Sequence, residues 1–321
     1  MLNNILITGA TGFVGSAVLE SLVRENLVFS TIVALRNASD LNQKYFASTK
    51  SVIVGSIDSE TDWSSALAGI VCVVHTAARV HVMSDTSPNS LDDFRKVNVD
   101  GTLNLARQAA AVGVRRFVFL SSVKVNGEQT CTGQVFAEDD DPSPQDFYGQ
   151  SKYEAELGLR QLAKDSGMEV VIIRPPLVYG PGVKANFAAL MRAVQRGLPL
   201  PLGSVNNQRS LVALNNLVHL IVTCLRHPAA ANQTFLVSDG QDISTPELLR
   251  SMARAARVSD RLWPVPVWAL EAAASAVGKG AAVQRLCGNL QVNITKVRTL
   301  LDWRPVVTMD EQLANMFEHK D

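Results

Sequence analysis

The chain has 321 residues, 47% of them hydrophobic, and its 30 Lys and Arg residues are balanced by 30 Asp and Glu residues. Such a chain can bury a large core, and we predict a soluble globular protein of one or two domains. The zero net charge gives no support for a nucleic-acid partner or for attraction to an anionic membrane surface.

The four cysteines, Cys72, Cys131, Cys224 and Cys287, are scattered along the chain. They form no C-x-x-C pair and lie beside no cluster of histidines, so neither a zinc site nor a disulfide framework is predicted. We expect no bound metal, and a reducing cytoplasm is the location that fits best.

Neither the N-terminus nor the most apolar segment is typical of a membrane protein. The apolar run near the N-terminus follows no basic residue and is broken at Thr8-Gly9, so no signal peptide is predicted. Residues 265–283 contain two charged residues and are too polar to span a bilayer. We predict one or two helices packed on the core there and no membrane insertion, with membrane association of this segment as the less favoured alternative.

Short β-branched runs alternate with amphipathic stretches through the first half of the chain. This alternation is typical of βαβ units and predicts an α/β fold with a parallel sheet. The predicted strands are residues 4–8, 31–35, 51–54, 71–75, 117–121 and 170–173. The predicted helices are residues 14–25, 90–112, 148–166 and 185–197.

The pattern changes near Pro175, where stretches rich in proline and glycine begin at residues 174–182 and recur at 198–203. We therefore predict a larger domain over residues 1–175 and a smaller α/β domain mainly over residues 176–321. A further strand near residues 234–240 is expected to return to the large sheet.

The first predicted strand runs into Gly9-Ala10-Thr11-Gly12-Phe13-Val14-Gly15 and then into a helix. Glycines allow a tight turn and a close approach of the backbone to a pyrophosphate, and the start of the helix offers free N–H groups. A strand before the turn and a helix after it strengthen the match. We predict a dinucleotide site that includes Gly9, Thr11, Gly12, Phe13 and Val14; the alternative is a turn without a ligand.

The end of the second predicted strand distinguishes NAD from NADP. An acidic residue there would bind the ribose 2′-hydroxyl of NAD, but this chain has Ala34-Leu35-Arg36-Asn37. The guanidinium of Arg36 suits a phosphate, so NADP(H) is favoured and NAD(H) is possible. The alternative is that Arg36 simply lies in solvent.

Tyr148 and Lys152 stand four residues apart at the start of a predicted helix, and so lie on one face of it. Reduction of a carbonyl needs an acid at its oxygen. The charge of Lys152, with that of an oxidised nicotinamide ring, is expected to lower the pKa of Tyr148. Ser122 follows a buried strand, at the edge where open α/β sheets bind ligands, and could bond the same substrate oxygen. Taken alone, the spacing of Tyr148 and Lys152 could arise by chance, and Ser122 would more readily be a turn serine that satisfies backbone groups.

Six segments together resemble the extended short-chain dehydrogenase/reductase family, the NAD-dependent epimerase/dehydratase group. The segments are Thr8-Gly9-Ala10-Thr11-Gly12-Phe13-Val14-Gly15, Val74-His75-Thr76-Ala77-Ala78, Asn98-Val99-Asp100-Gly101-Thr102, Ser121-Ser122, Tyr148-Gly149-Gln150-Ser151-Lys152 and Arg174-Pro175-Pro176. The resemblance implies a Rossmann domain, a doubly wound parallel sheet, that holds NAD(P). It implies Ser122, Tyr148 and Lys152 as the catalytic group.

The resemblance also implies contacts at single positions. For the cofactor they are Asp58, Ala77, Ala78, Lys152 and Pro175, although Ser56 stands where an adenine-binding aspartate is usual. For a substrate, often a nucleotide sugar, they are Ser122, Lys124, Asn186, Arg209 and Arg285. The two arginines are also physically suited to a diphosphate, although both could be surface charges.

Within the family, residues 121–127 and 198–203 look most like bacterial reductases of UDP-4-keto-6-deoxy-hexosamines. This likeness implies NAD(P)H-dependent reduction of the C4 keto group of a UDP-4-keto-6-deoxy-N-acetylhexosamine. The product would be a sugar such as UDP-N-acetylquinovosamine, used for surface polysaccharide (O-antigen or capsule).

This chain departs from the family pattern at positions that matter for two other reactions of the family, dehydration and epimerisation. The related dehydratases have Thr-Asp-Glu where this chain has Ser122-Val123-Lys124, so elimination of water lacks its acid–base pair. Asn126 replaces a tyrosine common in epimerases, which makes epimerisation less favoured.

Three alternatives to the reductase stay open. They are a UDP-hexose(amine) 4-epimerase with tightly bound NAD, a non-catalytic dinucleotide sensor that binds a protein partner, and a reductase of a small carbonyl compound without a nucleotide. We also expect a homodimer through the helices near residues 90–112 and 148–166.

Overall fold

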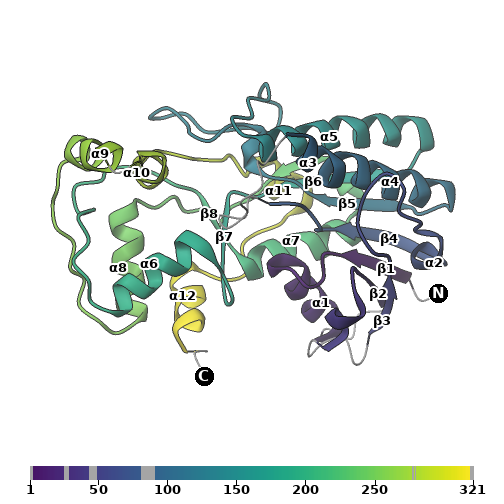
Figure 1. The fold of residues 1–321 in the computed structure, drawn as a ribbon, viewed down its shortest axis with the longest axis horizontal. Helices are drawn as coiled ribbons and strands as arrows, with labels where there is room; N and C mark the ends of the chain where they lie inside the picture. Colours follow the sequence, from purple (N-terminus) through teal and green to yellow (C-terminus); the bar gives the residue numbers. More distant parts are fainter. Residues whose placement is uncertain are drawn as a thin grey trace.

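The computed structural model describes residues 3–24, 29–42, 49–80, 91–276, 278 and 280–318. Two predicted helices reach beyond these ranges: helix 14–25 ends, and helix 90–112 begins, outside the described residues. A layer of strands with helices on both sides occupies one end of the molecule, and a smaller and mostly helical part occupies the other (Figure 1).

Seven parallel strands form the main sheet in the order β3-β2-β1-β4-β5-β6-β9. Their bounds are β1 Asn3–Thr8, β2 Phe29–Leu35, β3 Lys50–Ile53, β4 Ile70–His75, β5 Arg116–Leu120, β6 Glu169–Arg174 and β9 Thr234–Leu236. The central strands are buried on both faces, as their continuous apolar runs require. The strand order reverses between β1 and β4, so the predicted doubly wound fold is confirmed.

Helices cover both faces of this sheet. The helices are α1 Phe13–Arg24, α2 Ser64–Leu67, α3 Leu91–Arg95, α4 Thr102–Ala111, α5 Phe147–Ser166, α7 Leu214–Arg226 and α11 Thr295–Leu301. Buried side chains of α1, α7 and α11 join one core cluster, and those of α2, α4 and α5 join the other. Both clusters include sheet residues, so each lies between the sheet and one layer of helices.

The predicted helix 90–112 is not continuous where it is described. A π-helical turn, Lys96–Gly101, separates α3 from α4. A Cβ atom at Gly101 would lie 2.6 Å from Cγ2 of Ile57, so the helix approaches the loop after β3 as closely as glycine permits. A π-helical turn contains one residue more than an α-helical turn. Hydrophobic periodicity did not predict this insertion, because a π turn arises from tertiary contacts.

The C-terminal part has its own small core. Its elements are β7 Leu177–Tyr179, β8 Leu211–Ala213, α6 Ala185–Gln195, α8 Thr245–Ala255, α9 Val267–Ala276, α10 Gly280–Cys287 and α12 Met309–Glu318. β7 and β8 pair in parallel, and α6, α8 and α12 pack around a separate apolar cluster. The helices expected in residues 265–283 are α9 and the start of α10. Among the described residues, no helix combines the length and the apolar character needed to cross a bilayer.

Candidate active site

The glycine turn lies between β1 and α1, at the edge of the sheet where the parallel strands end. Gly9 has a φ of 73°, a conformation that favours glycine, and its carbonyl accepts a hydrogen bond from Gly12 N at 2.9 Å. A Cβ atom at Gly15 would lie 2.2 Å from the Gly9 carbonyl oxygen and 2.6 Å from Thr76 Oγ1. The close packing of turn, helix and β4 therefore depends on these glycines, and a turn so bare of side chains fits a pyrophosphate.

Replacing Gly15 with alanine is expected to destabilise the protein by about 1–3 kcal/mol, because the added methyl group has no space. It should also weaken binding of the predicted NAD(P) cofactor, since the turn must shift. Urea unfolding and a titration with NAD would measure both effects. Ser16→Ala, next along the same helix, is the control and should change stability by less than about 0.5 kcal/mol. A Gly15→Ala variant that matches this control would contradict the packing argument.

The other predicted cofactor residues follow the ends of neighbouring strands. Arg36 comes directly after β2 and is exposed, Ala77 and Ala78 follow β4, and Pro175 follows β6. Asp58 has a local structural role, because its carboxylate accepts hydrogen bonds from Glu60 N and from the hydroxyl of a nearby threonine. These residues share one edge of the sheet, and their contacts with a cofactor stay predictions.

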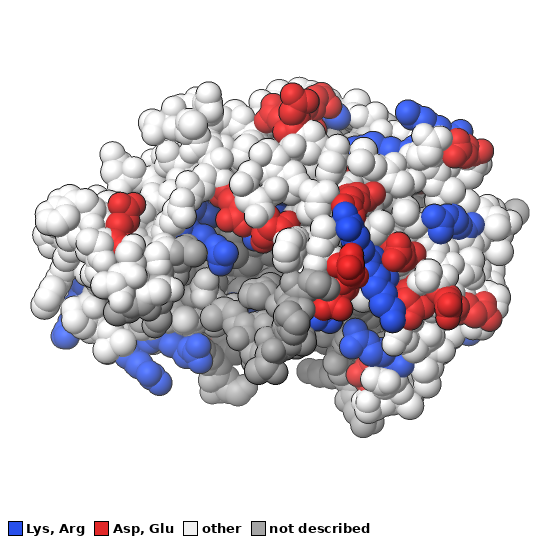
Figure 2. Space-filling view, turned by 45° about the horizontal axis from the view of Figure 1, so that its top comes forward, with Lys and Arg blue, Asp and Glu red and all other residues white. Residues whose placement is uncertain are grey.

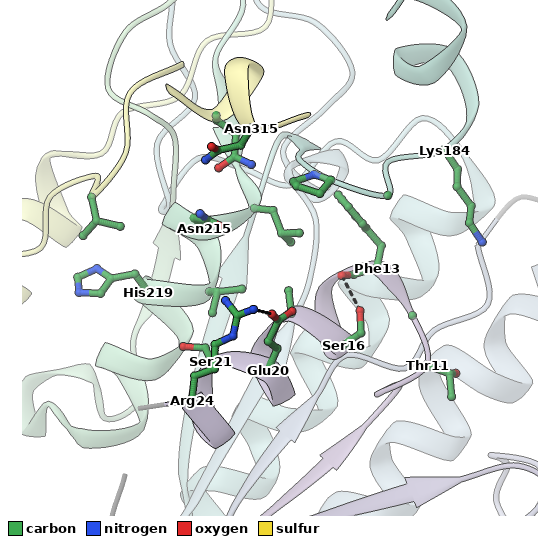
Figure 3. Close-up of a pocket in the computed structure, with 18 residues that line it drawn as sticks. Thr11, Phe13, Ser16, Glu20, Ser21, Arg24, Lys184, Asn215, His219 and Asn315 are labelled. Carbon is green, nitrogen blue, oxygen red and sulfur yellow. Dashed lines mark hydrogen bonds and ion pairs between the residues drawn. The ribbon is translucent and has the colours of Figure 1, made fainter. Parts of the chain in front are cut away.

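A cavity of about 1020 Å³ separates the glycine turn from the C-terminal part (Figure 3). Thr11 and Phe13 line it on one side. Lys184, from the loop before α6, Asn215 of α7 and Asn315 of α12 line it elsewhere. The turn therefore faces both the sheet edge and the part of the chain expected to bind substrate.

The predicted Tyr148–Lys152 pair lies in the first turns of α5. Asp146 caps this helix, since its Oδ1 accepts a hydrogen bond from Gly149 N at 2.7 Å. Lys152 is 1% exposed, and its Nζ donates to the carbonyl oxygen of Leu120 at 2.8 Å. The same Nζ lies 5.9 Å from the centre of the Tyr148 ring. The two side chains thus share one helix face at the end of β5.

Burial sets the proton affinity of both groups. It lowers the pKa of Lys152 to about 7, and the carboxylate of Glu156 opposes that fall. Burial raises the pKa of Tyr148, and the negative charge of Asp146 makes a smaller contribution in the same direction. Desolvation thus gives the direction of the Tyr148 pKa shift in this chain, and the lowering expected from Lys152 together with an oxidised nicotinamide ring stays a prediction.

Ser122 and Tyr148 open onto a second pocket, of about 570 Å³. Ser122 follows β5, and its hydroxyl accepts a hydrogen bond from Lys124 N at 3.2 Å. Seven of the predicted site residues line this one pocket: Ser122, Lys124, Tyr148, Pro175, Asn186, Arg209 and Arg285. Most of the remaining lining is apolar, from β7, α6 and α8. Residues that are far apart in the sequence thus line the same pocket.

Two of the predicted substrate residues already have partners. Lys124 Nζ forms ion pairs with Glu128, at 2.9 Å, and with Asp146. Arg209 Nη1 donates to the carbonyl oxygens of Arg285, at 2.8 Å, and Gly288, at 2.9 Å. These bonds fix the direction of the Arg209 side chain at the pocket wall.

Sequence reasoning missed the buried ion pair that supports the site. Glu156, 0% exposed, receives two hydrogen bonds from Arg174, at 2.9 and 2.6 Å, and one from the Ser121 hydroxyl at 2.5 Å. Glu156 is one helical turn beyond Lys152, and Arg174 opens the quoted Arg174-Pro175-Pro176 segment. The Glu156–Arg174 pair holds together α5, the end of β5 and the end of β6. Tyr148 lies on α5, and Ser122 and Pro175 follow β5 and β6.

Asn98 was also overlooked as a positioning residue. Its side chain lies in the π-helical turn, accepts from Arg79 N at 2.8 Å and donates to Ser151 Oγ at 2.9 Å. Ser151 precedes Lys152, so Asn98 ties the loop after β4 to α5. Its place in a quoted motif was the available signal, but the motif alone did not show what it contacts.

Residues 5–238 match the family model described as "Epimerase: NAD dependent epimerase/dehydratase family". The chain belongs to this family. It is 49% identical over 313 residues to a UDP-glucose 4-epimerase of Vibrio cholerae, covering 97% of this chain and 93% of that protein. The family resemblance stated from the sequence is therefore confirmed.

Solved structures agree on the fold. A UDP-N-acetylglucosamine 4-epimerase from Bacillus cereus has a TM-score of 0.79 at 20% identity, covering 99% of this chain and 96% of that one. A UDP-glucuronic acid 4-epimerase from the same organism, in complex with UDP-glucuronic acid and NAD, has a TM-score of 0.77 at 20% identity, with 98% of both chains covered. At these identities the likeness concerns the fold.

Proposed function

We propose that the protein is a UDP-sugar 4-epimerase that works with retained NAD. The similarity that carries this proposal is the 49% identity, along 97% of the chain, to a UDP-glucose 4-epimerase. The pocket that joins Ser122 and Tyr148 to Asn186, Arg209 and Arg285 supports it, since it offers acid–base groups and phosphate-binding groups in one space. This was the alternative in the sequence-based prediction and is now preferred to the reductase.

In the proposed reaction, Tyr148 takes the proton of the C4 hydroxyl and later returns a proton to the C4 oxygen. NAD bound at the glycine turn supplies the acceptor and donor of hydride. Ser122 holds the C4 oxygen by a hydrogen bond, and Lys152 lends positive charge when protonated. Because the pKa of Lys152 is about 7, groups that bind beside it can change its charge near neutral pH.

The proposed binding of a nucleotide-sugar substrate rests on Asn186, Arg209 and Arg285. Arg209 is held by the carbonyls of Arg285 and Gly288, and a guanidinium so oriented suits the oxygens of a diphosphate. Asn186 lies in the first turn of α6, on the same pocket wall. The apolar lining between these residues and Tyr148 would exclude water from the sugar.

The reductase is the second candidate, and Arg36 is the observation that favours it. Arg36 stands directly after β2, where an acidic residue would select NAD, and a released NADPH suits net reduction. If Arg36 binds a 2′-phosphate, Arg36→Ala should raise the KM for NADPH about tenfold and leave that for NADH unchanged. Equal KM values in the parent and the variant would remove this support.

The test is a pair of assays on the purified protein. First, UDP-glucose and UDP-N-acetylglucosamine are incubated without added cofactor, and the 4-epimers are separated by chromatography. Second, a UDP-4-keto-6-deoxy-N-acetylhexosamine is mixed with NADH or NADPH, and absorbance of the nicotinamide is followed. Epimer formation together with stoichiometric NAD in the purified protein supports the epimerase. Consumption of NADPH or NADH with no epimer in the first assay would replace it with the reductase.

A further inference from the structure

Two short segments meet at the pocket that contains Tyr148: the turn after β5, which carries Ser122, and the start of α5, which carries Tyr148. A Cβ atom at Gly149 would lie 2.9 Å from the carbonyl oxygen of Lys124 and 3.2 Å from its Cβ atom. The two backbones therefore approach as closely as glycine permits. The relative placement of Ser122 and Tyr148 depends on this contact.

Asp146, two residues before Tyr148, joins these segments through its carboxylate. Its Oδ1 accepts the hydrogen bond from Gly149 N, at 2.7 Å, that caps α5. Its Oδ2 forms an ion pair with Lys124 Nζ. An asparagine or a serine caps a helix about as well as an aspartate does, so the cap does not require a charge here. The ion pair with Lys124 does require one.

Lys124 is tied to Ser122 as well as to Asp146. Its backbone N–H donates to Ser122 Oγ at 3.2 Å, while its side chain pairs with Asp146 and Glu128. The side chains of the Lys124–Asp146 pair are 31% and 35% exposed, and a pair so exposed contributes little to folding stability. Its position between the two segments that carry Ser122 and Tyr148 is what sets it apart.

Opposite charges lie beside one another at several places on the face of the molecule shown in Figure 2. Pairing is thus common on this surface, and the Lys124–Asp146 pair differs in having a phenol next to it. The negative charge of Asp146 adds to the rise in the Tyr148 pKa that burial causes. Among the described residues, the other charged groups that line the pocket or lie beside the Tyr148 ring are Lys124, Glu128, Lys152, Arg209 and Arg285.

We propose that Lys124 and Asp146 are positioning residues for proton transfer by Tyr148: their ion pair holds the turn of Ser122 against α5 and neutralises the carboxylate beside the phenol. This role rests on the proposed function and deepens it. It is the same in an epimerase and in a reductase, because both exchange a proton through Tyr148. The proposed reaction begins with a phenolate, which an unpaired carboxylate beside it would oppose. Lys124 reduces that opposition while Asp146 keeps the helix capped.

This role differs from the substrate contact that the sequence implied for Lys124. Its ammonium group already has two carboxylates as partners, so its charge is balanced before a substrate enters. Arg209, in contrast, donates to carbonyl oxygens and keeps its net charge for a diphosphate. Loss of the Lys124 charge is therefore expected to change proton transfer more than substrate affinity.

Titration of the Tyr148 phenol in the full chain with added NAD tests the proposal. Ultraviolet absorbance of the phenolate is followed against pH, and the curve of the same protein with Tyr148→Phe is subtracted. Asp146→Asn keeps the cap and removes the charge, so the midpoint should fall by roughly half to one pH unit. Lys124→Met leaves the carboxylate without this partner, so the midpoint should rise by roughly the same amount. The pH dependence of kcat should move in the same directions, while KM for the sugar changes less than about threefold.

Asp165→Asn is the matched control, because it removes one carboxylate near the far end of α5, where Asp165 is exposed. Its midpoint should equal that of the parent. The double variant Lys124→Met with Asp146→Asn tests whether Lys124 acts through Asp146. In the Asp146→Asn background, the rise caused by Lys124→Met should shrink by at least about half.

Midpoints at the parent value in both single variants would overturn the proposal, and so would a rise from Lys124→Met that is equally large in the double variant. A higher KM for the sugar with an unmoved midpoint would assign Lys124 to substrate binding instead. Circular dichroism of each variant verifies that it folds. If Tyr148→Phe retained the parent activity, the proposed function itself would fail. Unmoved midpoints in an enzyme that depends on Tyr148 would remove only the positioning role.

Discussion

Replacing Tyr148 with phenylalanine is expected to lower kcat about 10²–10⁴-fold, because the phenol is the proton donor and acceptor of the proposed reaction. The ring stays, so the packing of α5 and the binding of NAD should be unchanged. Rates of epimer formation, with bound NAD measured after denaturation, provide the readout. A loss of kcat with the bound NAD retained would identify a defect in chemistry.

Tyr153→Phe is the matched control for this substitution. Tyr153 is on the same helix, and the pocket that contains Ser122 and Tyr148 does not include it among its described lining residues. Its variant should keep nearly all activity. If Tyr148→Phe also retained most of the parent activity, the proton-transfer role would be wrong, and the dinucleotide sensor considered from the sequence would become the better explanation.

The second large effect is expected from Glu156→Gln, which should lower the free energy of unfolding by about 3–5 kcal/mol. Glu156 is 0% exposed and bonds to Arg174, itself 1% exposed, so the variant leaves a buried guanidinium without its counter-charge. Arg160 Nη2, at 2.8 Å from the same carboxylate, loses this ion pair too and keeps its hydrogen bond to Thr234 Oγ1 at 3.1 Å. Urea unfolding followed by circular dichroism measures the change.

Glu154→Gln is the control on the same helix. Glu154 also forms two bonds with an arginine, Arg95, at 2.8 and 2.7 Å, but its side chain is 21% exposed and that of Arg95 is 42% exposed. Water screens such a pair, so this variant should lose less than about 1 kcal/mol. Equal losses in the two variants would mean that burial of the Glu156 pair is not what makes it important.

Several features of the site were predictable because they depend on local backbone geometry. The glycine turn is one, since a strand, a turn and a helix in succession need glycines where a Cβ atom would collide, as at Gly15. The four-residue spacing of Tyr148 and Lys152 is another, because it places two side chains on one face of any helix. The six predicted strands also overlap the observed ones, because β-branched runs of that length favour strands.

Other features depend on neighbours that are remote in the sequence. The charge of Lys124 is already shared by Glu128 and Asp146, and only the fold shows this. The rise in the Tyr148 pKa results from burial, which no spacing expresses. The choice between epimerase and reductase was not decided by the catalytic residues, because both reactions use the same proton transfer.

The sequence alone determined the doubly wound α/β fold, the position of the glycine turn and the membership of the family, because these follow from periodicity and from short motifs whose geometry is local. Tertiary structure decided which residues share the pocket of Tyr148, how Glu156 and Arg174 hold the site, and that Trp263 and Trp268 are exposed whereas Trp63 and Trp303 are buried. The physical reason is that desolvation and ion pairing depend on the side chains around a group in space, and chain order does not specify them.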